Sequence, residues 1–336
     1  MPGGADAVID GAIDAILADA PDHTPGTRPI HAPGIAVTGA FRASDVAAGF
    51  TDAAHFSGRS VPVTVRFSNG TGSMGDPDSK FLVRGMAVRF HVGAGRTGEV
   101  TTDMVGMTLP VFFTRTVETF MEFLEAARPT PVPSTPGWRK ALDALRLVPG
   151  PSRPLGPGEP GALAFANRYP PARQSMVDLT ALSVPESYVT CAYRTVHAFR
   201  LTKGEKVASV RFRWEPVAGV RSAAKGTEGD FLQQELRERL GRGPAEFVLR
   251  MQVAEQGDDT SDPTKPWSES RRRIVMGHLR VDRIVADQVN GCERLGFDPT
   301  RLVPGIELSD DPVLAARGPA YRRSLERRVG SPPAGA

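Results

Sequence analysis

The 336-residue chain is short of cysteine and has little net charge. Its two cysteines, Cys191 and Cys292, form no metal-binding motif. Such sparse use is typical of reduced thiols in a cytoplasmic protein, although two cysteines also permit one disulfide. A formal charge of +3 is too small to favour nucleic acid as a partner, and the arginines after residue 317 are typical of a solvated helix face.

Long apolar runs and nucleotide-binding motifs are missing as well. The first residues contain neither a basic segment nor a long apolar one, which predicts no signal peptide and no membrane span. No glycine-rich phosphate loop follows a predicted strand, and the regular alternation of strand and helix is absent. These absences argue against a nucleotide-binding fold.

What is present is the composition of a globular protein, with 40% apolar and 24% charged residues. Alternating apolar residues predict strands, and spacings of three and four predict helices. The proline-rich stretch 128–160 reads as an irregular wrapping arm. These patterns predict an α+β fold with an antiparallel sheet. The expected strands are 61–67, 83–90, 206–214, 246–253 and 273–283, and the expected helices are 5–19, 112–127, 137–147 and 311–328.

A tyrosine lies among spaced arginines in the last of these helices. At about 100° per residue, Arg317, Tyr321 and Arg328 fall within about 40° of one another. Arg317 precedes the phenol by one turn, and a nearby cation stabilises a phenolate, which is a ligand for ferric iron. Pro319 lies between them and is expected to kink or interrupt the helix.

A second set of polar residues lies in the N-terminal third. His31 is in a loop, and Arg66 and Ser68 share one face of a predicted strand, which we expect to point into a barrel. Arg66 suits a carboxylate, and Ser68 suits one imidazole nitrogen. The alternative is an edge strand on which both side chains face solvent.

From about residue 28 to 328, the chain resembles the haem catalases, and specifically the short catalase-related peroxidases. The resemblance implies a catalase-like fold, a closed antiparallel β-barrel with helical insertions and a C-terminal proximal helix. It rests on several segments in order, namely Arg28-x-x-His31-Ala, Val63 to Ser68, Arg84 to Phe90, Asp103 to Phe113, Asp262 to Trp267, and Phe297-Asp-Pro with Pro304-Gly-Ile-Glu307 ahead of the proximal helix.

The resemblance also implies an arrangement of the chain. We expect an N-terminal helix and arm at 1–27, a haem-binding core at 28–328 and a disordered tail at 329–336. Compared with the long catalases the sequence is shorter at both ends, so a monomer or homodimer is expected.

Haem b is the cofactor that the resemblance implies. It makes Tyr321 the iron ligand, supported by Arg317, and His31 the acid–base residue that Ser68 orients. The remaining implied cofactor contacts are Arg28, Arg66 and Arg328 at the propionates, and Ile30, Phe112, Phe120 and Phe297 around the haem. The implied reaction is reduction of hydrogen peroxide or an organic peroxide through a ferryl intermediate.

One departure concerns Met107, which stands where true catalases carry a distal asparagine. A thioether donates no hydrogen bond to peroxide, so weak dismutation and a larger share of peroxidase chemistry with an organic electron donor are predicted. Thr108, one residue on, is a possible source of polarity. The stretch 197–213, which binds reduced nicotinamide cofactor in some catalases, shows no pattern for one here, and His197 and His91 read as ordinary strand residues.

Two other functions remain open. A fatty-acid hydroperoxide-converting enzyme, such as an allene oxide synthase, also resembles catalase, but Ile30 gives His31 an apolar neighbour where such enzymes carry threonine. A haem-binding protein without turnover is the other alternative. Against it, buried polar groups without a use are costly.

Overall fold

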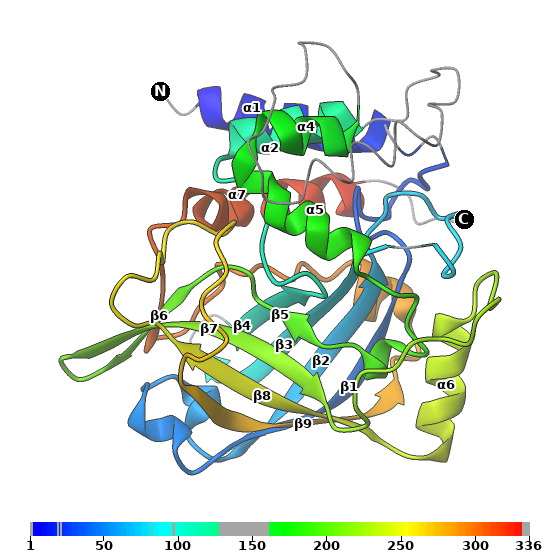
Figure 1. Cartoon of the computed structure of the whole chain (residues 1–336). Coiled ribbons are helices and arrows are strands. Elements are labelled where there is room, and N and C mark those ends of the chain that lie inside the picture. Colours follow the sequence, from blue (N-terminus) through cyan, green and yellow to red (C-terminus); the bar gives the residue numbers. More distant parts are fainter. Residues whose placement is uncertain are drawn as a thin grey trace.

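A closed barrel of eight antiparallel strands forms the body of the protein (Figure 1). The computed structural model describes residues 3–18, 20, 22–80, 82–95, 98–127 and 161–330. Around the barrel the order is β1-β2-β3-β4-β5-β7-β8-β9, and β9 pairs with β1. Short strands β6 and β10 extend the sheet beside β7. The strands are β1 Gly34–Ala43, β2 Ser60–Asn69, β3 Arg84–Gly95, β4 Gly98–Met107, β5 Tyr193–Arg194, β6 Phe199–Lys203, β7 Lys206–Pro216, β8 Ala245–Val253, β9 Arg273–Ile284 and β10 Ile306–Leu308.

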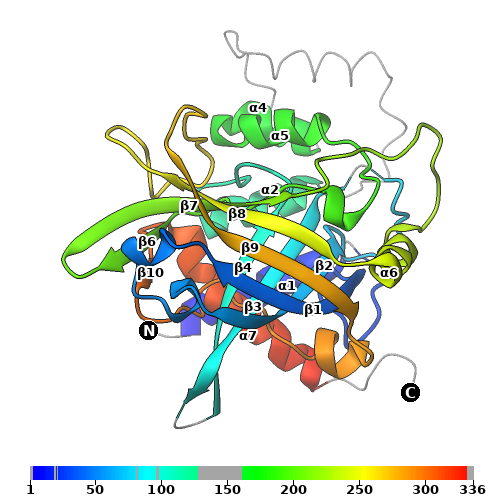
Figure 2. The ribbon, with the colours of Figure 1, turned by 90° about the horizontal axis from the view of Figure 1, so that it is seen from below.

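Helices cover the barrel on one side. Figure 1 shows α1, α2, α4 and α5 above it with α7 between. Viewed from below, α1, α2 and α7 lie behind the barrel, whereas α4 and α5 lie past its edge (Figure 2). Arg323 and Arg327 of α7 form ion pairs with Asp10 of α1, so part of the basic C-terminal run binds the N-terminal helix. The helices are α1 Gly3–Ala18, α2 Val117–Ala127, α4 Ala162–Arg168, α5 Arg173–Thr180, α6 Leu232–Arg242 and α7 Pro312–Val329.

The α+β fold with an antiparallel barrel is confirmed, and all five expected strands are present. Strand β1 was not predicted because its glycines and alanines weaken the apolar alternation. Helix α2 begins at Val117, later than expected. The expected helix 137–147 and the arm 128–160 lie outside the described residues, as do residues 331–336 of the tail. Among the described residues, no helix has the length and apolar character to cross a membrane.

Pro319 does not interrupt α7, so of the two effects expected from the sequence the interruption is wrong. The residue before a proline normally clashes with the proline ring through its own Cβ atom. Here that residue is Gly318, which has no Cβ, so the helical conformation is relieved of this clash. Proline still removes one backbone hydrogen bond, but 18 residues of helix remain in register.

The barrel interior is a packed apolar core. The ring of Phe41 meets Phe90 edge-on at 5.2 Å and Trp214 at 5.9 Å, and both partners are fully buried. Along β2, Val65 and Phe67 point into this core, and the alternate residues Arg66 and Ser68 therefore lie on the outer face of the barrel. The expectation that they point into the barrel was wrong.

His55 is a buried histidine in this core and makes stability depend on pH. Its ring lies 4.2 Å from Phe56 and 4.6 Å from Phe90, and its Nδ1 has no hydrogen-bond partner. Burial lowers its pKa to about 3, so the unfolded chain binds its proton first as pH falls. We expect His55 to cost roughly 2 kcal/mol of folding stability between pH 8 and pH 5. In urea unfolding, His55→Leu should lose less stability over this range than the wild type; an unchanged loss would contradict the assignment.

Candidate active site

The proximal half of the site lies on α7. Asp311 caps the helix by accepting hydrogen bonds from the backbone N–H groups of Val313 (2.9 Å) and Leu314 (3.2 Å), and Pro312 occupies the first turn. One turn later, Arg317 Nη2 donates to the Tyr321 hydroxyl at 2.6 Å. The predicted contact across Pro319 is therefore present.

A histidine–aspartate pair supports this helix and was missed from the sequence. His197 Nδ1 lies 2.6 Å from Asp311 Oδ2, and both side chains are 1% exposed. Burial lowers the pKa of His197 to about 4 against the opposing effect of Asp311, and Arg317 lowers it further. A neutral His197 thus donates to Asp311, while its Nε2 is buried without a described partner. His197 lies between β5 and β6 and is not the ordinary strand residue that was expected.

The distal half is built around His31. Its Nδ1 lies 3.0 Å from Ser68 Oγ, and Arg66 Nη1 donates to its backbone carbonyl at 2.8 Å. The backbone of His31 has a positive φ of 59°, an uncommon conformation that these contacts hold in place. Both Arg66 and Ser68 thus engage the histidine segment, in contrast to the solvated edge strand considered as the alternative.

Strand register places Met107 on the same face as this pair. Ser68 pairs with Gly85 of β3, and Gly85 pairs with Met107 of β4, so the three lie in one row across the sheet. A Cβ atom at Gly85 would lie 2.7 Å from Ser68 Oγ and 2.8 Å from the His31 ring, so glycine leaves the space that the imidazole occupies. The hydroxyl of Thr108 accepts a hydrogen bond from the backbone N–H of Arg84 at 3.1 Å, so it binds the first residue of β3.

His31 is held in its neutral form. Burial is the main cause that lowers its pKa to about 3, and the guanidinium groups of Arg66, Arg317 and Arg28 lower it further. Arg317 belongs to the proximal half, so the two halves are close enough to interact electrostatically. A neutral imidazole beside a fixed hydroxyl is suited to accept a proton.

Three arginines, Arg28, Arg66 and Arg328, converge on the end of the π-helix Val289–Glu293, and we call them the arginine cluster. Arg28 donates to the carbonyls of Cys292 (3.0 Å) and Leu295 (2.7 Å). Arg328 Nε donates to the Glu293 carbonyl at 3.2 Å. All three were predicted to act together, and the structure brings them together.

The apolar candidates divide into two groups. The rings of Phe112 and Phe120 lie 5.2 Å apart, and Phe112 is also 5.6 Å from His197. Ile30 is 39% exposed beside His31. Phe297 differs from these, because it is buried with Arg89 stacked over its ring at 5.2 Å, and none of its described contacts is to the other candidates.

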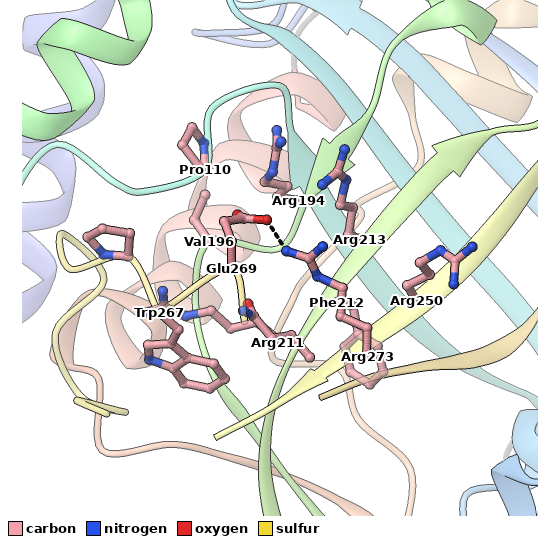
Figure 3. A pocket seen from close by; sticks show the side chains of 12 residues that line it. Pro110, Arg194, Val196, Arg211, Phe212, Arg213, Arg250, Trp267, Glu269 and Arg273 are labelled. Atoms are coloured by element: carbon pink, nitrogen blue, oxygen red, sulfur yellow. Dashed lines mark hydrogen bonds and ion pairs between the residues drawn. The ribbon is translucent and has the colours of Figure 1, made fainter. Parts of the chain in front are cut away.

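An arginine-rich pocket lies on the barrel, and Val196, the residue before His197, is part of its lining (Figure 3). Arg211 stacks on Trp267 at 4.5 Å, and Glu269 pairs with Arg273. Arg194 and Arg213 also line the pocket, so part of the stretch 197–213 surrounds a hollow suited to anions. The sequence showed no pattern there because the arginines come from four different segments.

The residues fit a haem by the chemistry of their donor groups. One side offers a phenol with a cation on its oxygen, and the other a neutral imidazole with a hydroxyl partner. The arginine cluster lies beside them and suits the two haem carboxylates. Within the described residues, no group of three or more histidine, cysteine or acidic side chains is arranged to hold a metal ion directly. Tyr321 is accordingly the candidate iron ligand.

Comparison with known proteins agrees with this geometry. The family model described as Catalase matches residues 21–151 and 164–332. A catalase-related peroxidase of Mycolicibacterium paratuberculosis is 35% identical over 300 residues, which cover 87% of this chain and 86% of the relative. A catalase-related peroxidase of Synechococcus elongatus is 27% identical, with 87% and 80% covered. A catalase of Alkalihalophilus pseudofirmus is 30% identical, but the match spans 43% of that longer protein. The chain belongs to the catalase family.

Proposed function

We propose that the protein is a haem b peroxidase that reduces hydrogen peroxide or organic peroxides at the expense of an organic electron donor, with weak dismutation. The supporting observation is the pairing of His31 with Ser68 on one side and of Arg317 with Tyr321 on the other. The catalase-related peroxidases at 35% and 27% identity support the same reaction class. The two cysteines are free and buried, which agrees with a cytoplasmic location.

His31 is the acid–base residue in this proposal. With Nδ1–H donated to Ser68, Nε2 is free to take a proton from one peroxide oxygen and return it to the other, departing oxygen. The O–O bond breaks and the departing oxygen leaves as water, or as an alcohol from an organic peroxide. Haem, when bound, supplies the iron that receives the two oxidising equivalents. Two electrons from the organic donor, together with two protons, reduce the second peroxide oxygen to water and restore the resting protein.

Tyr321 and its neighbours hold the other side. Arg317 donates to the phenolic oxygen and stabilises negative charge on it, which favours its binding to ferric iron. His197 and Asp311 act as positioning residues. Asp311 binds His197 and fixes the start of α7, the helix that carries Arg317 and Tyr321. Arg28, Arg66 and Arg328 would hold the propionates.

Met107→Asn tests the split between the two reactions. An asparagine would add a hydrogen-bond donor on the face that carries His31 and Ser68. We expect oxygen release from hydrogen peroxide to rise by roughly tenfold, the worth of one such bond, relative to oxidation of a dye donor. Both rates are measured on the haem-loaded protein, with an oxygen electrode and by absorbance.

The matched control is Met107→Leu, which keeps the volume and adds no donor. Its ratio of oxygen release to dye oxidation should equal that of the wild type. If the leucine variant changes the ratio as much as the asparagine variant, packing and not hydrogen bonding sets it. Failure of the wild type to consume peroxide at all would remove the proposed function.

A further inference from the structure

We infer that Glu293 is an internal carboxylate that binds Arg28 and Arg66 of the arginine cluster and competes with a haem propionate for them. The inference rests on the proposed function, because it requires the chain to bind haem. Glu293 touches none of the reacting atoms, and the role inferred for it concerns cofactor binding alone.

The contacts of Glu293 are those of a bound carboxylate. Its Oε2 accepts from Arg28 Nη1 at 2.6 Å, and its Oε1 accepts from Arg66 Nη2 at 3.0 Å. Cys292 Sγ also donates to Oε1 at 3.3 Å. The side chain therefore bridges guanidinium groups that come from two separate segments of the chain. A propionate at the arginine cluster would need the same type of contact.

The remaining donor groups of the arginines are largely taken. Arg66 donates from Nη1 to the His31 carbonyl and from Nε to Cys292 Sγ. Its Nη2 donates to the Ala32 carbonyl as well as to Glu293. Arg28 donates from Nη2 to two backbone carbonyls. The N–H groups of Arg28 and Arg66 that bind a side-chain carboxylate are thus the ones bound to Glu293. An external carboxylate must share these N–H groups with Glu293 or displace Glu293 from them.

Burial and charge indicate why such a group is present. Burial lowers the pKa of Arg28 to about 9, and the nearby charges of Arg66 and Arg328 lower it further. At Arg66, which is also buried, the charge of Glu293 opposes the effect of burial and the pKa is raised. Glu293 thus offsets part of the repulsion between the guanidinium groups. Its side chain is 21% exposed against 3% for Arg66, so it is the member of the group best placed to turn outward when another carboxylate arrives.

The test is haem titration of the apo-protein, followed by absorbance, for the wild type, Glu293→Gln and Glu228→Gln. Glu228 is exposed in a loop and provides the same change of charge away from the cluster. We expect Glu293→Gln to bind haem roughly tenfold more tightly, because two charge-assisted contacts are released, and its apo form to melt at a lower temperature. Haem dimethyl ester, which lacks the carboxylates, should show no gain, and Glu228→Gln should behave as the wild type.

Several results would overturn the inference. Equal or weaker haem binding by Glu293→Gln would mean that Glu293 only shapes the site, and an equal gain with the ester would mean that propionates are not involved. Glu293→Asp keeps the charge but reaches less far, so it serves if the glutamine variant does not fold, and it too must bind haem more tightly than the wild type. Absence of haem binding by the wild type would instead remove the proposed function itself.

Discussion

Replacing His31 with asparagine is expected to slow the reaction of the haem-loaded protein with hydrogen peroxide by roughly 10²–10⁴-fold, the usual worth of a positioned acid–base group. Asparagine removes the imidazole but tolerates the positive φ of 59° at this position better than alanine does. Haem content should stay near that of the wild type, because His31 is not the proposed iron ligand. Stopped-flow absorbance of the haem band measures the rate.

The pH dependence of this step provides a second readout on the wild type. Because the pKa of His31 is lowered to about 3, the imidazole stays neutral from pH 8 to pH 5 and the rate should be constant across that range. Ser68→Ala leaves the imidazole in place and should cost far less than His31→Asn. A wild-type rate in the asparagine variant would show that the proton acceptor is another group.

The sequence was informative wherever the chemistry is local. Helical spacing places Arg317 one turn from Tyr321, and the period of a strand places Arg66 and Ser68 on one face, and the structure has both arrangements. The family resemblance supplied the link between these two halves, which lie more than two hundred residues apart. Periodicity within one segment does not show which distant segments of the chain come together.

The missed features depend on contacts between distant segments. His197 and Asp311 are 114 residues apart, and neither belongs to a local motif that marks it as buried. Glu293 reads as one more acid in a polar stretch until the chain folds it against Arg28 and Arg66. The direction of Arg66 and Ser68 was misjudged for the same reason, since alternation defines two faces but does not say which one encloses the core.

The outer position of the site explains its polarity. The barrel interior is filled by aromatic and aliphatic side chains, so it has no room for charged groups. On the outer face, α7 and the segment 289–295 supply hydrogen-bond partners for buried arginines, which are costly without them. A site between barrel and helix therefore combines a rigid sheet for His31 and Ser68 with a separate helix for Tyr321.

Replacing Tyr321 with phenylalanine is expected to abolish the ferric spectrum that a phenolate ligand gives and to lower peroxide consumption by at least roughly 100-fold. The phenolic oxygen is the candidate iron ligand and the acceptor of the Arg317 hydrogen bond, so the change removes both. Loss of an outer partner of a metal ligand already costs about 10–100-fold, and loss of the ligand itself should cost more. Absorbance of the haem-loaded protein and peroxide decay measure the two effects.

Tyr169→Phe is the matched control, because it also removes one phenolic oxygen, which accepts only the backbone N–H of Arg115 at 3.3 Å among its described contacts and has none with Arg317. Its spectrum and peroxide consumption should equal those of the wild type. An unchanged spectrum in Tyr321→Phe would make the axial assignment wrong. An altered spectrum with unchanged peroxide consumption would support Tyr321 as the ligand. It would also show that the charge on the phenolic oxygen does not control the reaction. Among the described contacts, Arg317 has no hydrogen-bond acceptor other than Tyr321, so the phenylalanine variant also leaves its guanidinium without an acceptor.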